Sequence, residues 1–130
     1  MTYLLDTNVV IAMMAGHAEV VRKMQVAGTA SLFVPTIVMH ELYFGAYKSQ
    51  RSVENLRRID ALRLNQLDFD AMDARCAAEL RLDLQKTGTP IGPYDTLIAG
   101  QALARDLTLV TRNTREFARI AGLRVENWQD

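Results

Sequence analysis

The sequence predicts an α/β fold with a central, mostly parallel β-sheet flanked by α-helices. Short apolar segments typical of buried strands alternate with longer segments of helical periodicity, and this alternation favours parallel strands covered on both faces. The chain has 130 residues, of which 49% are hydrophobic and 23% charged, as in an ordinary globular protein. No internal repeat, low-complexity run or long linker divides it, so we expect one domain over residues 1–130.

The first half of the chain predicts two strands and four helices. Residues 3–5 are expected to form a buried strand that stops at the turn-forming Asp6-Thr7-Asn8, and residues 32–34 a second strand that Pro35 closes. Thr36 is expected to cap the helix that follows. The predicted helices cover residues 9–14, broken at Gly16, residues 18–26, ending near Gly28, the segment after Thr36 to about residue 47, and the amphipathic residues 52–62.

The second half continues the alternation. Residues 67–69 predict a short strand or an extended connection. Asp70-x-x-Asp73 resembles an acidic capping arrangement for a long helix. The apolar stripe expected on that helix consists of Met72, Cys76, Leu80 and Leu84. Two prolines and two glycines make residues 87–93 a loop, and the remaining elements are a helix over 94–105, a strand over 107–111, a helix over 114–118 and a strand over 123–125.

Charge and cysteine content restrict the classes of function. Fifteen Lys and Arg balance fifteen Asp and Glu, which argues against a protein that coats nucleic acid through bulk positive charge. The single Cys76 excludes an intramolecular disulfide and fits a reducing cytoplasm, where we expect the protein. The longest apolar stretch, residues 9–16, is far shorter than the roughly 20 residues of a spanning helix, so we expect no membrane association.

Separate parts of the chain are expected to bring acids to one edge of the sheet. Ligands bind at the carboxyl ends of the strands in an open parallel sheet. Asp6 follows the first strand, Asn113 and Glu116 follow the fourth, and Asp95 opens the helix just before the fourth. Glu41 lies in an otherwise apolar helical segment, where a charged carboxylate needs a partner.

Each of these residues also has a structural interpretation. The alternatives are Asp6 as the cap of the helix it precedes, Asp95 as a favourable acid in a first helical turn, Asn113 with Glu116 as a capping pattern, and Glu41 as a residue that reaches solvent or pairs with Lys48. Their common position along one edge favours a shared site. Clustered carboxylates are stable as anions only with a cation among them, and hard oxygen ligands point to Mg²⁺ or Mn²⁺ rather than zinc. Such ions act on phosphates, which indicates phosphodiester hydrolysis.

Four further segments stand out in order along the chain: Leu4–Asn8, His40–Ala46, Pro90–Gly100 and Val110–Phe117. Together they resemble the motifs of the PIN-domain ribonucleases, and specifically of the VapC toxins of bacterial type II toxin–antitoxin modules. The resemblance covers essentially the whole chain, to the ending at residues 122–128, and implies a PIN-like fold.

The resemblance implies that Asp6, Glu41 and Asp95 are the metal-binding carboxylates of the active site. It also implies hydrolysis of RNA with Mg²⁺, or Mn²⁺ in its place, to leave a 5′-phosphate and a 3′-hydroxyl. Many PIN domains carry a fourth acid where this chain has Asn113, and Glu116 would compensate directly or through a water.

Further groups are expected around these carboxylates. Thr7, Asn8 and Thr111 would orient the carboxylates or a bound water. Arg112, Arg115, Lys48 and Arg51 could hold the RNA backbone, although they could equally lie on the solvated faces of helices. His17 and His40 are expected to be surface or capping residues.

The resemblance further implies a homodimer and a cognate VapB-type antitoxin. Family substrates are structured RNAs, often tRNA, and the segments Gly-Pro-Tyr-Asp and Asn-Thr-Arg-Glu-Phe are similar to those of members that act on initiator tRNA. An alternative is a catalytically weak or inactive module that binds an antitoxin, because Asn113 replaces an acid. A third, a nucleotide- or phosphate-binding domain, is disfavoured because neither GxGxxG nor GxxxxGK[ST] follows a strand.

Overall fold

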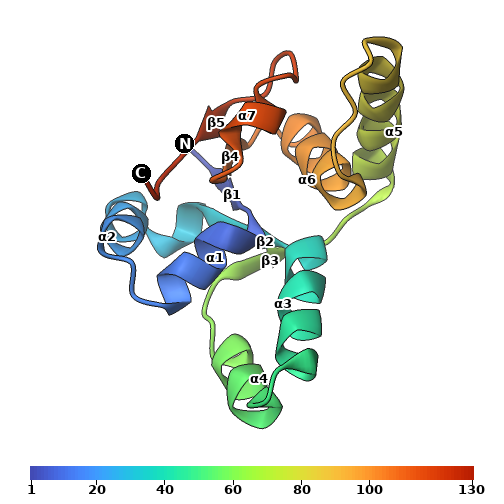
Figure 1. Ribbon diagram of the computed structural model, residues 1–130. Helices are drawn as coiled ribbons and strands as arrows, with labels where there is room; N and C mark the ends of the chain where they lie inside the picture. The colour runs from blue at the N-terminus through green and yellow to red at the C-terminus, as the bar shows by residue number, and fades with distance from the viewer.

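The computed structural model describes all 130 residues and has one five-stranded parallel sheet at its centre (Figure 1). Its strands are β1 (Tyr3–Leu5), β2 (Leu32–Pro35), β3 (Asn65–Leu67), β4 (Thr108–Val110) and β5 (Val125–Glu126). They lie in the order β3-β2-β1-β4-β5, and every neighbouring pair is parallel. The α/β prediction is therefore confirmed, with a sheet that is parallel throughout.

Seven helices surround this sheet, and each predicted helix is present. They are α1 (Thr7–Met14), α2 (Ala18–Ala27), α3 (Thr36–Lys48), α4 (Ser52–Asp60), α5 (Ala71–Lys86), α6 (Pro93–Ala104) and α7 (Thr114–Phe117). Figure 1 shows α5 and α6 side by side, with α4 beyond the end of α3 on the other side of the molecule. None of the seven is long and apolar enough to cross a membrane.

The central strands are buried as continuous apolar runs. Leu4, Leu5, Leu109 and Val110 of β1 and β4 are inaccessible to solvent, as expected for parallel strands covered on both faces. The helices contribute the rest of a cluster of 25 buried apolar residues. This core fixes the two middle strands, and with them the polar residues at their carboxyl ends.

Three predictions about element ends are wrong. β5 covers residues 125–126 rather than 123–125, because its pairing with β4 aligns Val125 with Leu109 and Glu126 with Val110. Thr36 does not cap α3, because Pro35 holds the cap position and Thr36 is already the first helical residue, with no side-chain capping bond. β3 covers residues 65–67 rather than 67–69, because its pairing with β2 aligns Asn65 with Phe33 and Leu67 with Pro35. Leu67 is thus the last residue of the strand.

The predicted apolar stripe of α5 is also wrong in part. Met72 is 63% exposed and Cys76 only half-buried, whereas Leu80 and Leu84 are buried. The buried face of α5 begins instead at Asp73, which is completely inaccessible. The predicted capping arrangement is confirmed, since Asp70 and Asp73 form a reciprocal capping box.

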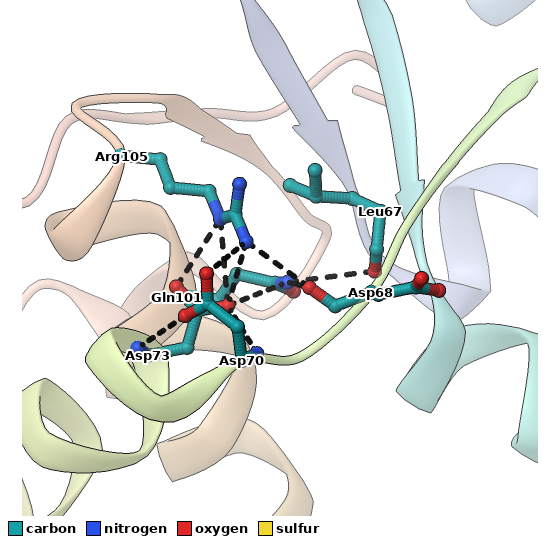
Figure 2. Close-up of polar contacts among 6 residues, drawn as sticks. All are labelled: Leu67, Asp68, Asp70, Asp73, Gln101 and Arg105. Carbon is teal, nitrogen blue, oxygen red and sulfur yellow. Dashed lines mark hydrogen bonds and ion pairs between the residues drawn. The ribbon is translucent and has the colours of Figure 1, made fainter.

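The burial of Asp73 is explained by a polar network that joins α5 to the end of α6 (Figure 2). Arg105, the residue after α6, donates to the Asp73 carboxylate from Nε at 3.2 Å and from Nη2 at 3.1 Å. Gln101 Nε2 donates to Asp73 Oδ2 at 3.2 Å and to the carbonyl of Asp68, just beyond β3, at 3.1 Å. The network therefore locks α6 to α5 and to the sheet edge.

Candidate active site

The candidate site lies where the connections of the sheet diverge. β1 pairs with β2 on one side and with β4 on the other, so the chain leaves the carboxyl end of β1 at a topological switch point. In open α/β sheets this point forms a crevice for ligands. The residues immediately after β1 and β4 are Asp6 and Thr111.

Asp6 is held rigidly at this point. It is 6% exposed, and its backbone N–H donates to the Val110 carbonyl at 3.0 Å, which extends the β1–β4 pairing by one residue. Asp6 Oδ1 accepts from the Thr7 N–H at 2.8 Å, and Oδ2 accepts from the buried Thr111 hydroxyl at 2.8 Å. Asp6 is also the N-terminal cap of α1, which confirms the structural interpretation of this residue. The capping role is compatible with a place in a shared site.

Asp95 lies in the first turn of α6 and approaches the other acids. Its pKa is raised to about 6, first by burial and then by the negative charges of Asp6, Glu116 and Glu41. A carboxylate is affected in this way only by charges close to it. Acids that follow β1 and β4 and acids carried by α3 and α6 therefore converge, as the sequence predicted.

Glu41 is half-buried on α3, on the same side of the sheet edge. Its pKa is raised by burial and by the charge of Asp6, while Thr7 and His40 counteract part of the rise. The alternative partner Lys48 is not used, because its ammonium lies over the Phe44 ring, 5.2 Å from the centroid. Glu41 makes no ion pair with any basic side chain of the protein.

Asn113 and Glu116 form a linked pair beside these acids. Asn113 is at the cap position of α7 but makes no side-chain capping bond, so the predicted capping pattern is wrong. Its Nδ2 donates instead to Glu116 Oε2 at 3.0 Å, and its backbone N–H donates to the Thr111 hydroxyl at 3.0 Å. Hydrogen bonds therefore connect Glu116 to Asp6 through Asn113 and Thr111.

Apart from Thr7 and Thr111, the remaining predicted residues make no hydrogen bond or ion pair with these carboxylates. Asn8 is exposed on the second residue of α1, in contrast to Thr7 and Thr111. Arg112 and Arg115 are exposed on either side of Asn113 in the sequence, and Arg51 is exposed with only a long 3.8 Å ion pair to Glu54. His17 caps α2 through Nδ1, as expected, and His40 is exposed.

The donor set fits a hard divalent cation. Its ligands would be carboxylate and amide oxygens. Burial first, and then the negative charge of neighbouring carboxylates, raises the pKa of Asp95 and of Glu41, and a cation would offset that charge. The buried Thr7 hydroxyl helps to lower the pKa of Glu41, but it has no hydrogen-bond partner within 3.5 Å. No three acidic side chains are close enough to share one ion as they stand, which is consistent with their mutual repulsion.

Comparison with known proteins identifies the family. The sequence matches the PIN domain family over residues 3–123. The chain belongs to the PIN domain family. This PIN domain is 38% identical to a protein of Shigella flexneri named tRNA(fMet)-specific endonuclease VapC, over 97% of both chains. It is 36% identical to Ribonuclease VapC2 of Rickettsia felis over 98% of both chains, and is thus a VapC endoribonuclease.

Solved structures agree with this placement of the PIN domain. A DNA-bound VapBC complex from Salmonella typhimurium contains a chain with a TM-score of 0.92 and 38% identity over 98% of both chains. A chain of VapBC2 from Rickettsia felis, bound to a DNA fragment from its promoter, has a TM-score of 0.91 and 34% identity, and covers 98% of this PIN domain and 99% of that chain.

One feature beside the carboxylates was not predicted from the sequence. The His40 ring lies 5.6 Å from the Tyr94 ring, so that the pair connects the start of α6 to α3. The available signal was that each aromatic residue immediately precedes a candidate metal ligand, in His40-Glu41 and in Tyr94-Asp95.

Proposed function

We propose that this VapC endoribonuclease hydrolyses a phosphodiester bond of initiator tRNA with Mg²⁺, or Mn²⁺ in its place, held by Asp6, Glu41 and Asp95. The observation that carries the proposal is the convergence of these acids at the switch point, expressed in the pKa of about 6 for Asp95. The substrate is supported by relatives from Shigella flexneri and Salmonella typhimurium, which are 38% and 39% identical and named as specific for tRNA(fMet).

The carboxylates would divide their roles according to their surroundings. When bound, the cation would activate a water and stabilise charge on the phosphate oxygens. Asp6 is the fixed ligand, because Thr7 and Thr111 already orient both of its oxygens. Glu41 and Asp95 have raised pKa values and would ligate as anions once a cation offsets the charge of Asp6. Asn113 and Glu116 would support the site from the β4 side.

The RNA backbone would be held by exposed cations around this site. Arg112 and Arg115 stand next to Asn113, and Lys48 and Arg51 lie at and beyond the end of α3. Each is exposed and can offer its positive charge to a phosphate, which is the main source of affinity for nucleic acid.

The proposed partner is a VapB-type antitoxin. The Salmonella typhimurium and Rickettsia felis structures that resemble this chain are VapBC complexes. We also propose that the chain forms a homodimer and acts in the cytoplasm, where its proposed substrate is found.

The experiment that tests the function is cleavage of purified initiator tRNA. We expect a discrete fragment with Mg²⁺ or Mn²⁺, none with EDTA, and none from Asp95→Asn. Asp83→Asn is the matched control, because Asp83 is an exposed acid on α5 outside the site. It should cleave as the wild type does, which separates the enzyme from contaminating ribonucleases.

The possible failures of this experiment are distinct. Cleavage of another RNA, with initiator tRNA intact, would reject the substrate but keep the nuclease. A folded, antitoxin-free protein that cleaves neither tRNA nor ribosomal RNA would support the inactive binding module instead. Metal binding is measured separately by thermal unfolding with and without Mg²⁺, where Asp95→Asn should lose much of the stabilisation and Asp83→Asn should retain it.

A further inference from the structure

The aromatic pair His40 and Tyr94 lies next to the acids but has no part in the proposed metal site. The two rings belong to different helices, and their centroids are 5.6 Å apart with planes inclined by 52°. His40 is exposed, and Tyr94 is 48% exposed. Because both side chains are exposed, each ring retains surface that a planar group could cover.

The pair lies at the turns of α3 and α6 that carry two of the acids. His40 directly precedes Glu41 in α3, and Tyr94 directly precedes Asp95 in α6. Consecutive side chains of a helix point about 100° apart, but the ring contact joins the two helices at the level where the charge of Glu41 acts on Asp95. A nucleotide that presents its phosphate to the acids would therefore have its base, or that of its neighbour, beside these rings.

Packing alone does not account for the pair. The core of the protein is made by other residues of α3 and α6, such as Val38, Leu42 and Ile98, which are almost completely buried. Exposed rings beside neighbouring acids are instead typical of RNA recognition, in which unstacked bases of single-stranded loops are covered by Tyr or His side chains.

We propose that His40 and Tyr94 form a stacking platform for one base next to the scissile phosphodiester of the RNA substrate. The platform positions the RNA strand and does not take part in bond cleavage. This inference depends on the proposed ribonuclease function, and it adds the residues that hold the base.

The first test is single-turnover cleavage of the anticodon stem-loop of initiator tRNA. His40→Ala and Tyr94→Ala should each raise the half-saturating enzyme concentration by about tenfold, within the range measured for base–aromatic stacking, and change the maximal rate by less than about twofold. Tyr94→Phe should behave as the wild type, because it keeps the ring and loses only the hydroxyl.

Tyr47→Ala is the matched control for removal of an exposed aromatic ring. Tyr47 is 69% exposed on the same helix, seven residues beyond His40. That separation is about 10 Å along the helix axis, so its loss should leave the half-saturating concentration unchanged.

The second test is spectroscopic and detects stacking directly. Stem-loops that carry 2-aminopurine at successive positions around the cut are titrated with the Asp95→Asn enzyme, which does not cleave them. The 2-aminopurine fluorescence of one position should be quenched when the Asp95→Asn enzyme binds. The quenching should be lost when Tyr94→Ala is combined with Asp95→Asn in one enzyme, and it should persist when Tyr94→Phe is combined with Asp95→Asn.

Several results would overturn the platform. One is an unchanged half-saturating enzyme concentration in both alanine variants, or a loss in the maximal rate alone. Another is a Tyr94→Phe variant that is as defective as Tyr94→Ala. A defect confined to dimer formation or antitoxin binding would assign the pair to a protein interface. If the wild-type enzyme cleaves the stem-loop and both alanine variants cleave it equally well, only the platform is rejected. Wild-type enzyme that does not cleave rejects the proposed function and the platform together.

Discussion

Asp6 and Asp95 show how two identical side chains in one site come to differ. Asp6 is almost fully buried, and both of its oxygens accept hydrogen bonds, from Thr7 and Thr111. Asp95 is half-buried and subject to three other carboxylates, and its pKa is raised to about 6. The first is oriented before any ligand arrives, whereas the second carries an electrostatic cost that a cation would relieve.

We expect Asp95→Asn to stabilise the fold more at high pH than at low pH. The pKa of Asp95 is about 6 in the folded state, which is above its ordinary value of 3.8. The contribution of Asp95 to the free energy of unfolding is therefore fully present below pH 3.8 and is lost as the pH rises through about 6. The amide cannot ionise and does not show this loss. After allowance for partial exposure, the gain over wild type should grow by about 1 kcal/mol between about pH 4.5 and about pH 8.

Urea unfolding of both proteins at each pH, without divalent cations, measures this difference. The control is Asp83→Asn, an exposed acid whose substitution should have the same effect at both pH values. An equal gain for Asp95→Asn at both pH values would contradict the raised pKa.

At the scale of elements, α5 and α6 approach each other unusually closely at one point. Gly100 of α6 is buried against Ala77 of α5, and a Cβ on Gly100 would lie 2.6 Å from the Ala77 Cα and Cβ atoms. Real Cβ atoms do not tolerate such a distance, so the two helix backbones pack directly on each other. This contact fixes the helix that carries Asp95 at its start.

Gly100→Ala should therefore destabilise the protein, in spite of the better helix propensity of alanine. We expect a loss of about 1–3 kcal/mol, because the helices must separate to admit the methyl group. Gly45→Ala in α3 is the matched control, since a Cβ there meets no atom within 4 Å, and should gain about 0.5–1 kcal/mol. Chemical denaturation measures the change in the free energy of unfolding for both variants. An unchanged free energy of unfolding for Gly100→Ala would show that the helices can move apart freely.

The ion pair between Asp73 and Arg105 fixes the same two helices at the opposite end of α6 (Figure 2). Arg105→Ala would leave the fully buried Asp73 carboxylate without its cation, which should cost about 3–5 kcal/mol. Arg22→Ala, which removes an exposed ion pair with Glu19, should cost less than about 0.5 kcal/mol. Equal losses of unfolding free energy in the two variants would show that the buried pair contributes no more than a surface one.

At the scale of the whole molecule, the formal net charge is zero, but the charged residues are unevenly distributed. Acids gather at the carboxyl ends of the central strands, and Arg112 and Arg115 are exposed beside them. A neutral protein can therefore bind RNA at one place without binding polyanions over its whole surface.

Charge reversal at Arg112 or Arg115 should weaken RNA binding without unfolding the domain. Loss of a phosphate contact lowers the affinity and makes its salt dependence less steep by about one unit in the logarithmic slope. Arg75→Glu on the exposed face of α5 is the control, and it should change neither quantity. Binding to the tRNA stem-loop over several salt concentrations measures both, and unchanged affinity for the site variants would remove these arginines from the interface.

Much of the molecule followed from local properties of the sequence. Apolar runs and their interruptions predicted the helices and the central strands, because burial on both faces requires such runs and Gly or Pro ends them. The edge strand β3 was misplaced, because two of its three residues are polar and exposed. Asp6, Asp95 and Glu116 were singled out by their positions after strands or at helix starts, and Glu41 by its place in an apolar helix. Other failures depended on side-chain orientation, as in the missing cap at Thr36 and the exposed Met72.

The sequence by itself determined the α/β class and the order of the elements, and it singled out the candidate acids, because these depend on residue type and spacing along the chain. Only the tertiary structure decided that Thr111 anchors Asp6, that Asn113 binds Glu116 rather than capping α7, and that Asp73 is buried against Arg105. Each of these contacts joins side chains on different elements or selects one rotamer among several. Such choices depend on how the helices pack, and packing is a property of the whole chain.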